Sequence, residues 1–343
     1  MKISIHKQNP NMVKSVVDQV YMDNEDPDDR WTIEPILNPD IWELRDMAVG
    51  ATWFVPEIIF ADDLKDWNDP KKINVDERHF IEMVLAFFAG ADKLVADNIN
   101  MNFLKDVKCM EAEYFYKHQC FMEDIHAEVY SRFLTTYIKD RTKINKLRNS
   151  LTEIPVVKRK GDWARRYADA DTADFAERLI AFTIFEGVFF SGSFCAIFYF
   201  RTKGLLDGLC LANDFIARDE RLHCDFSCLL YSHLIKKLST EKVHKMFKEA
   251  VDIEVEFVAE ALKVPLIGIN ADSMTQYIQF VADYWLLQLG YPRLFKVENP
   301  FHWMHLISMD SKSNFFEKRV PDYAISGVGT EEDENKYGYD DDF

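Results

Sequence analysis

Glycine and proline are scarce in this chain of 343 residues, with 12 and 11 copies. Sandwiches, barrels and doubly wound sheets need such residues at regular intervals, because tight turns depend on their backbone conformations. Their low number and irregular spacing therefore favour an all-helical fold. The hydrophobic content of 48% is enough for a large buried core.

A surplus of basic residues is missing as well. The chain has 41 Lys and Arg against 58 Asp and Glu, which gives a net charge of −17. Surfaces that bind nucleic acids need clustered Lys and Arg to neutralise phosphates. Direct binding to DNA or RNA is therefore not expected.

The six cysteines form no CxxC pair, and the first residues, MKISIHK, contain no apolar run typical of a secretory signal. Most of the cysteines lie in apolar helical stretches, where a reduced thiol packs as a small hydrophobic group. We therefore expect a reducing, cytoplasmic location.

One apolar stretch, Leu179 to Phe200, has the length of a membrane span and a single ionisable side chain before Arg201, that of Glu186. The glycines and serines at 187 and 191–193 suit close helix packing, so a helix buried inside the protein is the simpler interpretation. No membrane contact is expected. The lone carboxylate then needs a partner in the interior.

Apolar residues that recur at three- and four-residue steps predict several long helices. Asp162 is the expected N-cap of a helix that begins at Trp163. Long antiparallel helices around a buried centre form a four-helix core, here with additional helices. The predicted core helices cover residues 75–105, 108–139, 174–202 and 211–237, and two or three more helices follow between 240 and 290.

Two Glu-x-x-His pairs, Glu123/His126 and Glu220/His223, lie on separate predicted helices. Residues three apart share one helix face, so each pair can present a carboxylate and an imidazole to one metal ion. A single such pair often arises by chance on a solvated helix surface. Two pairs indicate a metal site.

Asp92 and Glu186 lie in apolar helical segments, where an unpaired carboxylate is costly. They complete the ligand set of a ferritin-like bundle, in which two helices give one carboxylate each and two give a Glu-x-x-His pair. Four carboxylates balance two divalent cations, and this oxygen-rich set suits iron or manganese. The predicted fold is therefore a ferritin-like helical bundle with a buried dimetal-carboxylate site.

Tyr130 follows His126 by one helical turn and should lie near the metals without being a ligand. A buried tyrosine is usually part of the core. Phe190, Phe194 and Ile216 lie one or two turns from predicted ligands and would surround the phenol with apolar groups. Such a dry pocket could protect an oxidised tyrosine.

Four segments, FFAGADKLV, MEDIHAEVYS, FEGVFFSGSF and IARDERLHCDF, together resemble the small, radical-generating subunit of class I ribonucleotide reductase in its eukaryotic and viral form. The resemblance extends from about Trp31 to Phe343. It implies two oxo-bridged iron ions, with manganese as an alternative, that react with dioxygen and oxidise Tyr130 to a stable radical. The implied ligands are Asp92, Glu123, His126, Glu186, Glu220 and His223.

The resemblance also implies a route by which the radical reaches a large subunit that reduces ribonucleotides. Trp53 in GATWFVPE and Asp219 in ARDE match the residues that join the metals to the subunit surface. Their alternative roles are structural, as a core tryptophan and as a carboxylate that orients His126. A homodimer is implied by the family.

At the C-terminal end, Tyr323 matches the tyrosine that relays the radical across the subunit interface, with Tyr337 and Tyr339 as competitors. The segment 331–343 has seven acidic residues against one lysine and resembles a tail that docks on the large subunit through Phe343. A solubilising tail is the alternative. The expected organisation is an N-terminal arm at 1–30, a ferritin-like domain at 31–312 and a flexible tail at 313–343.

Two other functions fit a dimetal helical bundle. An oxygenase or oxidase would use the metals directly on an organic substrate, and would need an access channel but no docking tail. An iron-storage or purely structural bundle would need neither Trp53, Asp219 nor the tail.

Overall fold

The computed structural model describes residues 30–262, 269–301, 303 and 304. Every regular element in these ranges is helical, so the predicted all-α class is confirmed. In chain order the elements are α2 (Pro39–Gly50), η2 (Val55–Glu57), η3 (Phe60–Asp63), α3 (Leu64–Trp67), α4 (Val75–Asn98), the π-helical η4 (Ile99–Phe103), α5 (Leu104–Asp106), α6 (Met110–Tyr137), α7 (Arg141–Arg148), α8 (Ser150–Glu153), α9 (Pro155–Ala168), α10 (Phe175–Gly187), α11 (Ser191–Thr202), α12 (Asp207–His233), α13 (Thr240–Ala261) and α14 (Ala271–Gln288).

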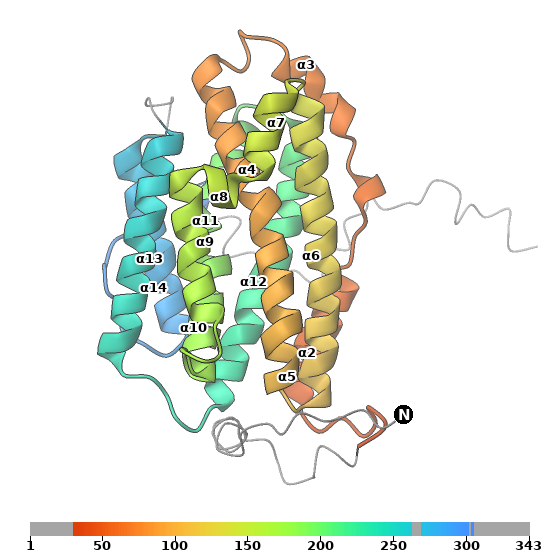
Figure 1. Ribbon diagram of the computed structural model, residues 1–343, viewed down its shortest axis with the longest axis vertical. Coiled ribbons are helices and arrows are strands. Elements are labelled where there is room, and N and C mark those ends of the chain that lie inside the picture. The colour runs from red at the N-terminus through yellow and green to blue at the C-terminus, as the bar shows by residue number, and fades with distance from the viewer. Residues whose placement is uncertain (1–29, 263–268, 302, 305–343) are drawn as a thin grey trace, which may run out of the picture. The chain divides into compact units, whose positions relative to one another are not determined.

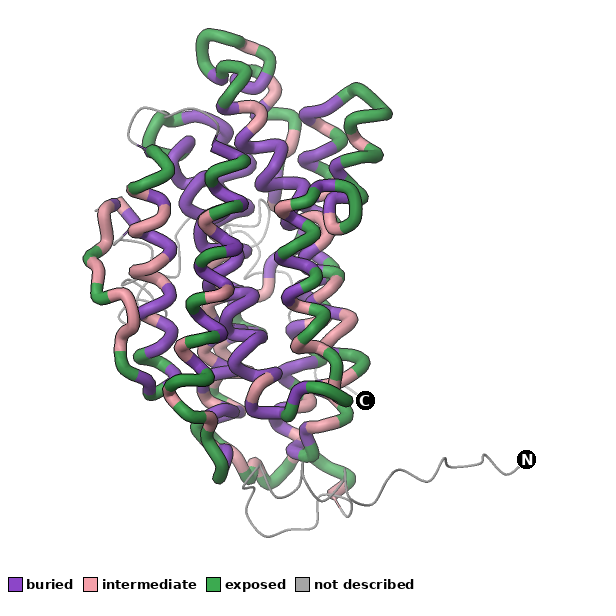
Figure 2. Tube along the Cα trace, turned by 60° about the vertical axis from the view of Figure 1, so that its left-hand side comes forward, coloured by how far each residue is buried: buried purple, intermediate pink, exposed green. Residues whose placement is uncertain are grey.

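The core is built from four helices, α4, α6, α10 and α12. Helix α4 packs along α6, and α10 packs along α12, as Figure 1 shows. Figure 2 shows that buried residues line the inward-facing sides of the long helices. Helices α13 and α14 pack on each other and on α10, so one side of the core carries an additional layer.

The predicted helix over 174–202 is interrupted. Helix α10 ends at Gly187, and α11 begins at Ser191 after a turn at 188–190. The backbone N–H groups of Val188 and Phe189 both donate to the Ile184 carbonyl, at 2.8 and 3.1 Å. The turn residues are Val, Phe and Phe, so the sequence contains no glycine or proline here that would have predicted the break.

The segment Phe175–Thr202 is long and apolar enough to cross a membrane by composition alone. In the structure, 94% of its most apolar part is buried inside the protein. This burial is typical of a core helix and agrees with the expectation for this segment.

The predicted N-cap at Asp162 is wrong. Helix α9 begins at Pro155, and Asp162 lies inside it, where its carboxylate pairs with Lys158 and Arg165 on the exposed face. Proline at the first helical position costs no hydrogen bond, because the first N–H groups of a helix have no partner within it. The start signal was therefore Pro155.

Helix α12 begins at Asp207 rather than near Leu211, because carboxylates from a distant segment cap it. Asp63 accepts hydrogen bonds from the N–H groups of Gly208 and Leu209, at 2.8 and 2.9 Å. Asp66 accepts one from the Leu206 N–H at 3.2 Å. The helix has no side-chain cap of its own.

The predicted N-terminal arm and C-terminal tail lie largely outside the described residues. The predicted arm at 1–30, except Arg30, and the predicted tail at 313–343 are not described, nor are Tyr323 and Phe343. The domain limits therefore stay predictions.

Candidate metal centre

Four buried side chains point to one place in the core. Glu123 on α6, Glu186 on α10, and Glu220 and His223 on α12 each offer a ligand atom, and these atoms all lie within 4.8 Å of one another. The Nδ1 atom of His223 is 3.0 Å from Glu220, 3.2 Å from Glu123 and 3.8 Å from Glu186. Three carboxylates and one imidazole thus share a single buried space.

His126 joins this cluster from α6. Its Nδ1 atom lies 3.1 Å from Glu220 Oε1 and 3.7 Å from Glu123 Oε2. Its Nε2 atom lies 3.1 Å from Asp219 Oδ2. A carboxylate behind a ligating histidine fixes its ring and its tautomer, so this geometry leaves Nδ1 free to face a metal.

Asp92 on α4 is fully buried, and neither of its carboxylate oxygens has a hydrogen-bond partner. Burial raises its pKa well above the ordinary value, and the negative charge of Glu123 adds to this effect. The sixth predicted ligand is therefore within electrostatic reach of the others.

Glu186 and Glu123 have pKa values shifted in opposite directions. Burial, reinforced by the charge of Glu220, raises the pKa of Glu186 well above its ordinary value. Burial also opposes ionisation of Glu123, but the neighbouring imidazoles of His126 and His223 outweigh it and lower the pKa of Glu123 to about 2. Burial also opposes protonation of the two imidazoles, but the neighbouring carboxylates raise the pKa of His126 well above its ordinary value and that of His223 to about 9.

The donor atoms fit a pair of divalent cations. Six buried polar atoms of the predicted ligands have no hydrogen-bond partner, although such atoms are rarely left unsatisfied in a native core. Oxygen and imidazole nitrogen are the donors that iron and manganese accept. The six atoms are Asp92 Oδ1, Asp92 Oδ2, Glu123 Oε2, His126 Nδ1, Glu186 Oε2 and Glu220 Oε1.

Gln119 is a further residue of the site that sequence reasoning missed. Its Nε2 atom lies 3.1 Å from Glu186 Oε1 and 3.5 Å from Glu123 Oε1, and the side chain is fully buried. It precedes Glu123 by four residues on α6 and so occupies the same face. That spacing was a signal that could have identified it.

Trp53 and Asp219 form a connected path to His126. The indole Nε1 of Trp53 donates to Asp219 Oδ2 at 2.7 Å, and the same oxygen faces His126 Nε2. The rings of Trp53 and His126 are stacked, with centroids 6.0 Å apart. The structure therefore brings together three residues that the sequence analysis had linked by resemblance.

Tyr130 is fully buried on α6, and its hydroxyl has no hydrogen-bond partner. Its ring stacks on Phe88 of α4, with centroids 4.4 Å apart and planes 5° from parallel. Phe190 and Phe194 both contact Phe88, at 5.2 and 5.1 Å between centroids. The ring directly on Tyr130 is thus Phe88, which sequence analysis missed. Ile216 is fully buried on α12.

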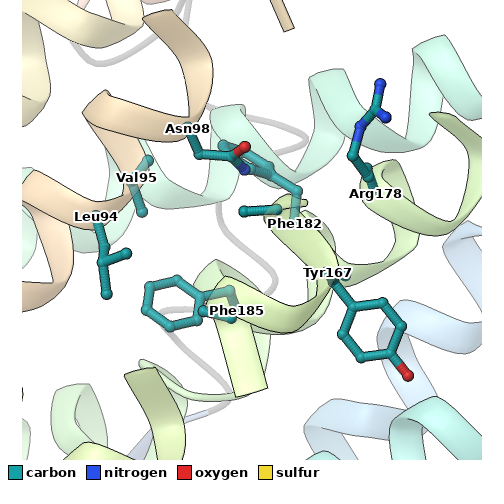
Figure 3. Close-up of a pocket in the computed structure, with 10 residues that line it drawn as sticks. Leu94, Val95, Asn98, Tyr167, Arg178, Phe182 and Phe185 are labelled. Atoms are coloured by element: carbon teal, nitrogen blue, oxygen red, sulfur yellow. The ribbon is translucent and has the colours of Figure 1, made fainter. Parts of the chain in front are cut away.

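A small cavity lies between α4, α9 and α10, beside the helices that carry Asp92 and Glu186 (Figure 3). Val95, Phe182 and Phe185 are among its lining residues, and its volume is about 30 Å³. That is about the space of one water molecule. A cavity of this volume is too small for an organic substrate, and none of the candidate ligands lines it.

Comparison with known proteins gives the family. A family model described as "Ribonucleotide reductase, small chain" matches residues 30–300. The chain is 45% identical to the ribonucleoside-diphosphate reductase small subunit of Dictyostelium discoideum over 318 residues, which are 93% of this chain and 92% of the relative. It is also 45% identical to the small chain from vaccinia virus (strain Ankara) over 314 residues, 92% and 97% of the two chains.

Solved structures agree. The ribonucleotide reductase Rnr4 homodimer from Saccharomyces cerevisiae has a TM-score of 0.75 and 32% identity, covering 85% of this chain and 91% of that chain. The ribonucleotide reductase R2 subunit from Clostridium botulinum shares the fold, with a TM-score of 0.76 and 18% identity over 90% of this chain and 98% of its own. Together with the matches in sequence, these results show that the chain belongs to the ribonucleotide reductase small-chain family.

Proposed function

We propose that this chain is the radical-generating small subunit of a ribonucleoside-diphosphate reductase, an oxidoreductase that converts ribonucleotides to deoxyribonucleotides. The observation that carries the proposal is the placement of Tyr130. Its phenol is buried, without a hydrogen-bond partner, and the nearby charges that act on it are those of Asp92, Glu220 and Glu123. An oxidisable side chain is therefore held, dry, beside the candidate metal ligands.

Asp92, Glu123, His126, Glu186, Glu220 and His223 would hold two metal ions. We infer iron, although manganese accepts the same donors. When bound, the metals supply the oxidising power by activating dioxygen. The chain's own task is to exclude water from Tyr130 and to fix the distance between its phenol and the ligands.

Burial raises the pKa of Tyr130 well above its ordinary value, and the charge of Asp92 adds to this effect. The phenol therefore stays protonated at rest, and its oxidation to a neutral radical releases a proton together with the electron. The aromatic rings of Phe88, Phe190 and Phe194 close the surroundings and keep solvent from quenching the product. Ile216 belongs to the same proposed pocket.

Electron transfer to and from the site would use the hydrogen-bonded path through Trp53, Asp219 and His126. We propose that Tyr323 continues this path and that the tail, anchored by Phe343, docks on a large subunit. A homodimer and a cytoplasmic location complete the proposal. No contact with nucleic acids or membranes is included.

The experiment is to add iron(II) and oxygen and to record the electron paramagnetic resonance spectrum. We expect a tyrosyl radical signal that Tyr130→Phe abolishes while the metal content is unchanged. The matched control is Tyr116→Phe, because Tyr116 is also a fully buried tyrosine on α6 with an unpartnered hydroxyl. A signal that survives in the Tyr130 variant, or disappears in the Tyr116 variant, contradicts the proposal.

A further inference from the structure

Lys160 on α9 is a fully buried cation that the proposed chemistry does not use. Its ammonium group lies 2.6 Å from Glu254 Oε2 on α13 and donates to the Phe189 carbonyl at 2.7 Å. Glu254 is fully buried as well. The interior of the protein therefore contains an ion pair that also binds a backbone carbonyl.

Aromatic rings enclose this ammonium group. Its Nζ atom lies 3.3 Å from the ring centroid of Phe87 and 4.0 Å from that of Phe257, which are cation–π distances. The ring of Phe87 in turn contacts Phe190 at 5.5 Å and Phe185 at 6.3 Å. Lys160 thus packs against an aromatic cluster that includes Phe190.

The carbonyl that Lys160 binds belongs to the turn at 188–190, where the chain leaves α10. Helix ends leave carbonyls without partners inside the helix, and a buried carbonyl cannot use water instead. Glu254 lies on the other side of the same break, because a Cβ atom built on Gly192 would be 2.6 Å from Glu254 Oε1. The ion pair therefore fits against both ends of the interruption.

Stability alone does not account for this pair. Burial lowers the pKa of Lys160 to about 8 and raises the pKa of Glu254 to about 7, so both charges are held at a cost. Buried ion pairs can often be replaced by apolar residues of similar size without loss of stability. The local geometry that the pair imposes is the remaining explanation.

We propose that Lys160 and Glu254 are positioning residues, which fix the turn at 188–190 and thereby place the carboxylate of Glu186 and the ring of Phe190. Glu186 precedes the turn by two residues, and Phe190 is its last residue. A rotation of the Phe189 peptide would move both. The effect on the turn follows from the contacts above, whereas the effect on metal binding rests on the proposed role of Glu186 as a ligand.

The test uses the double variant Lys160→Met/Glu254→Leu in the full-length, metal-free protein. The readout is amide hydrogen exchange of a peptide that covers residues 184–194. We expect exchange at the turn to become at least tenfold faster. The matched control is Arg159→Met/Glu256→Leu, because this pair joins the same two helices on the exposed surface.

Unchanged exchange in the double variant, or an equal increase in the surface control, overturns the proposal. Glu254→Asp keeps both charges but withdraws the carboxylate by one methylene. This single variant replaces the double variant if the latter does not fold. We expect amide exchange at the turn to become at least threefold faster in it, and unchanged exchange overturns the proposal.

A second measurement is competitive titration with manganese(II), for which we expect at least tenfold weaker binding in the double variant. Faster exchange with unchanged metal affinity would overturn the positioning of Glu186. Absence of metal binding by the parent protein would instead contradict the proposed function, so the two failures are distinguishable.

Discussion

At the scale of single residues, the surroundings of the carboxylates decide which of them can ionise without a metal. Glu123 lies beside both histidines, which lower its pKa to about 2. Asp92 has no such donor, and burial raises its pKa. Two carboxylates of the same proposed site thus differ in how readily they ionise.

Gln119 allows a test of whether a hydrogen bond to a metal ligand strengthens metal binding. Its amide donates to Glu186 at 3.1 Å, so Gln119→Leu removes a hydrogen bond that orients this carboxylate. Loss of such partners typically weakens metal binding by about 10- to 100-fold. We expect an effect of this size in a metal titration, with the helical circular dichroism unchanged.

The control for Gln119 lies on the same helix. Lys117→Leu changes an exposed residue of α6 that pairs with Glu113. It should leave metal affinity within about twofold of the parent protein, because exposed ion pairs contribute little. Equal weakening by both substitutions would show that α6, rather than the Gln119 amide, is responsible.

Lys160 and Glu254 predict an unusual dependence of stability on pH. The pKa of Lys160 falls from 10.5 to about 8 in the folded protein, so the unfolded chain binds more protons between these values, and stability rises with pH there. The pKa of Glu254 rises from 4.5 to about 7, so the folded protein binds more protons between these values, and stability falls as pH rises.

The two effects make the pair least favourable between about pH 7 and 8. One pKa unit corresponds to about 1.4 kcal/mol, so each effect is on the order of 3 kcal/mol. Urea unfolding of the parent and of Lys160→Met/Glu254→Leu at pH 5, 7.5 and 10 measures the contribution of the ion pair to the free energy of unfolding. The parent's stability relative to the variant should be lowest at the middle pH, and a constant difference would refute the prediction.

At the scale of elements, the spacing of apolar residues along the sequence predicted the first two ligand helices well. Helices α4 to α5 and α6 lie within a few residues of the predicted 75–105 and 108–139. The turn at 188–190 was not predictable in this way, because its stabilising donor, Lys160, lies 29 residues away along the chain. The same holds for Phe88, whose contact with Tyr130 joins two helices.

The Glu-x-x-His pairs were recognisable because both members lie on one helix at a fixed spacing. The sequence could not show that Asp219 accepts from Trp53 and faces His126, since these residues come from three different segments. Resemblance to a family supplied that link. Tertiary contacts of this kind leave no periodic pattern.

The start of α12 depends on Asp63, which accepts two backbone N–H groups and the hydroxyl of Tyr137. Asp63→Ala leaves these buried donors without a partner. A lost cap and an unsatisfied buried group each cost on the order of 1–2 kcal/mol. We therefore expect a loss of roughly 3 kcal/mol in the free energy of unfolding, measured by urea denaturation.

Asp207→Ala is the control for Asp63. Asp207 is the exposed first residue of the same helix, and its nearest cation, Lys65, is 4.0 Å away. This variant should change the free energy of unfolding by less than about 0.5 kcal/mol. A similar loss in both variants would mean that charge at the helix end matters rather than the cap.

At the scale of the whole molecule, the proposed tail is needed for turnover with the large subunit but not for assembly of the metal site. Deletion of residues 332–343 removes acidic residues and Phe343 but none of the candidate ligands. We expect the radical signal to persist and ribonucleotide reduction with the large subunit to fall at least tenfold, because docking is lost. Full activity after deletion would reject the docking role.

A synthetic peptide tests the docking role of the tail by competition. Residues 332–343 alone should compete with the full chain for the large subunit and inhibit reduction. The matched peptide with Phe343→Ala should inhibit at least tenfold less, because it lacks the apolar anchor. Equal inhibition by both peptides would assign docking to the acidic residues.

The candidate ligands are spread over four helices, from Asp92 to His223 in a chain of 343 residues. During synthesis on a ribosome, α4 and α6 emerge first and carry only two carboxylates and one imidazole. The other half of the set follows on α10 and α12, and Glu186 is 60 positions after His126. A complete ligand set therefore exists only after about two thirds of this chain has been translated, so the earlier helices alone cannot form the proposed dimetal site.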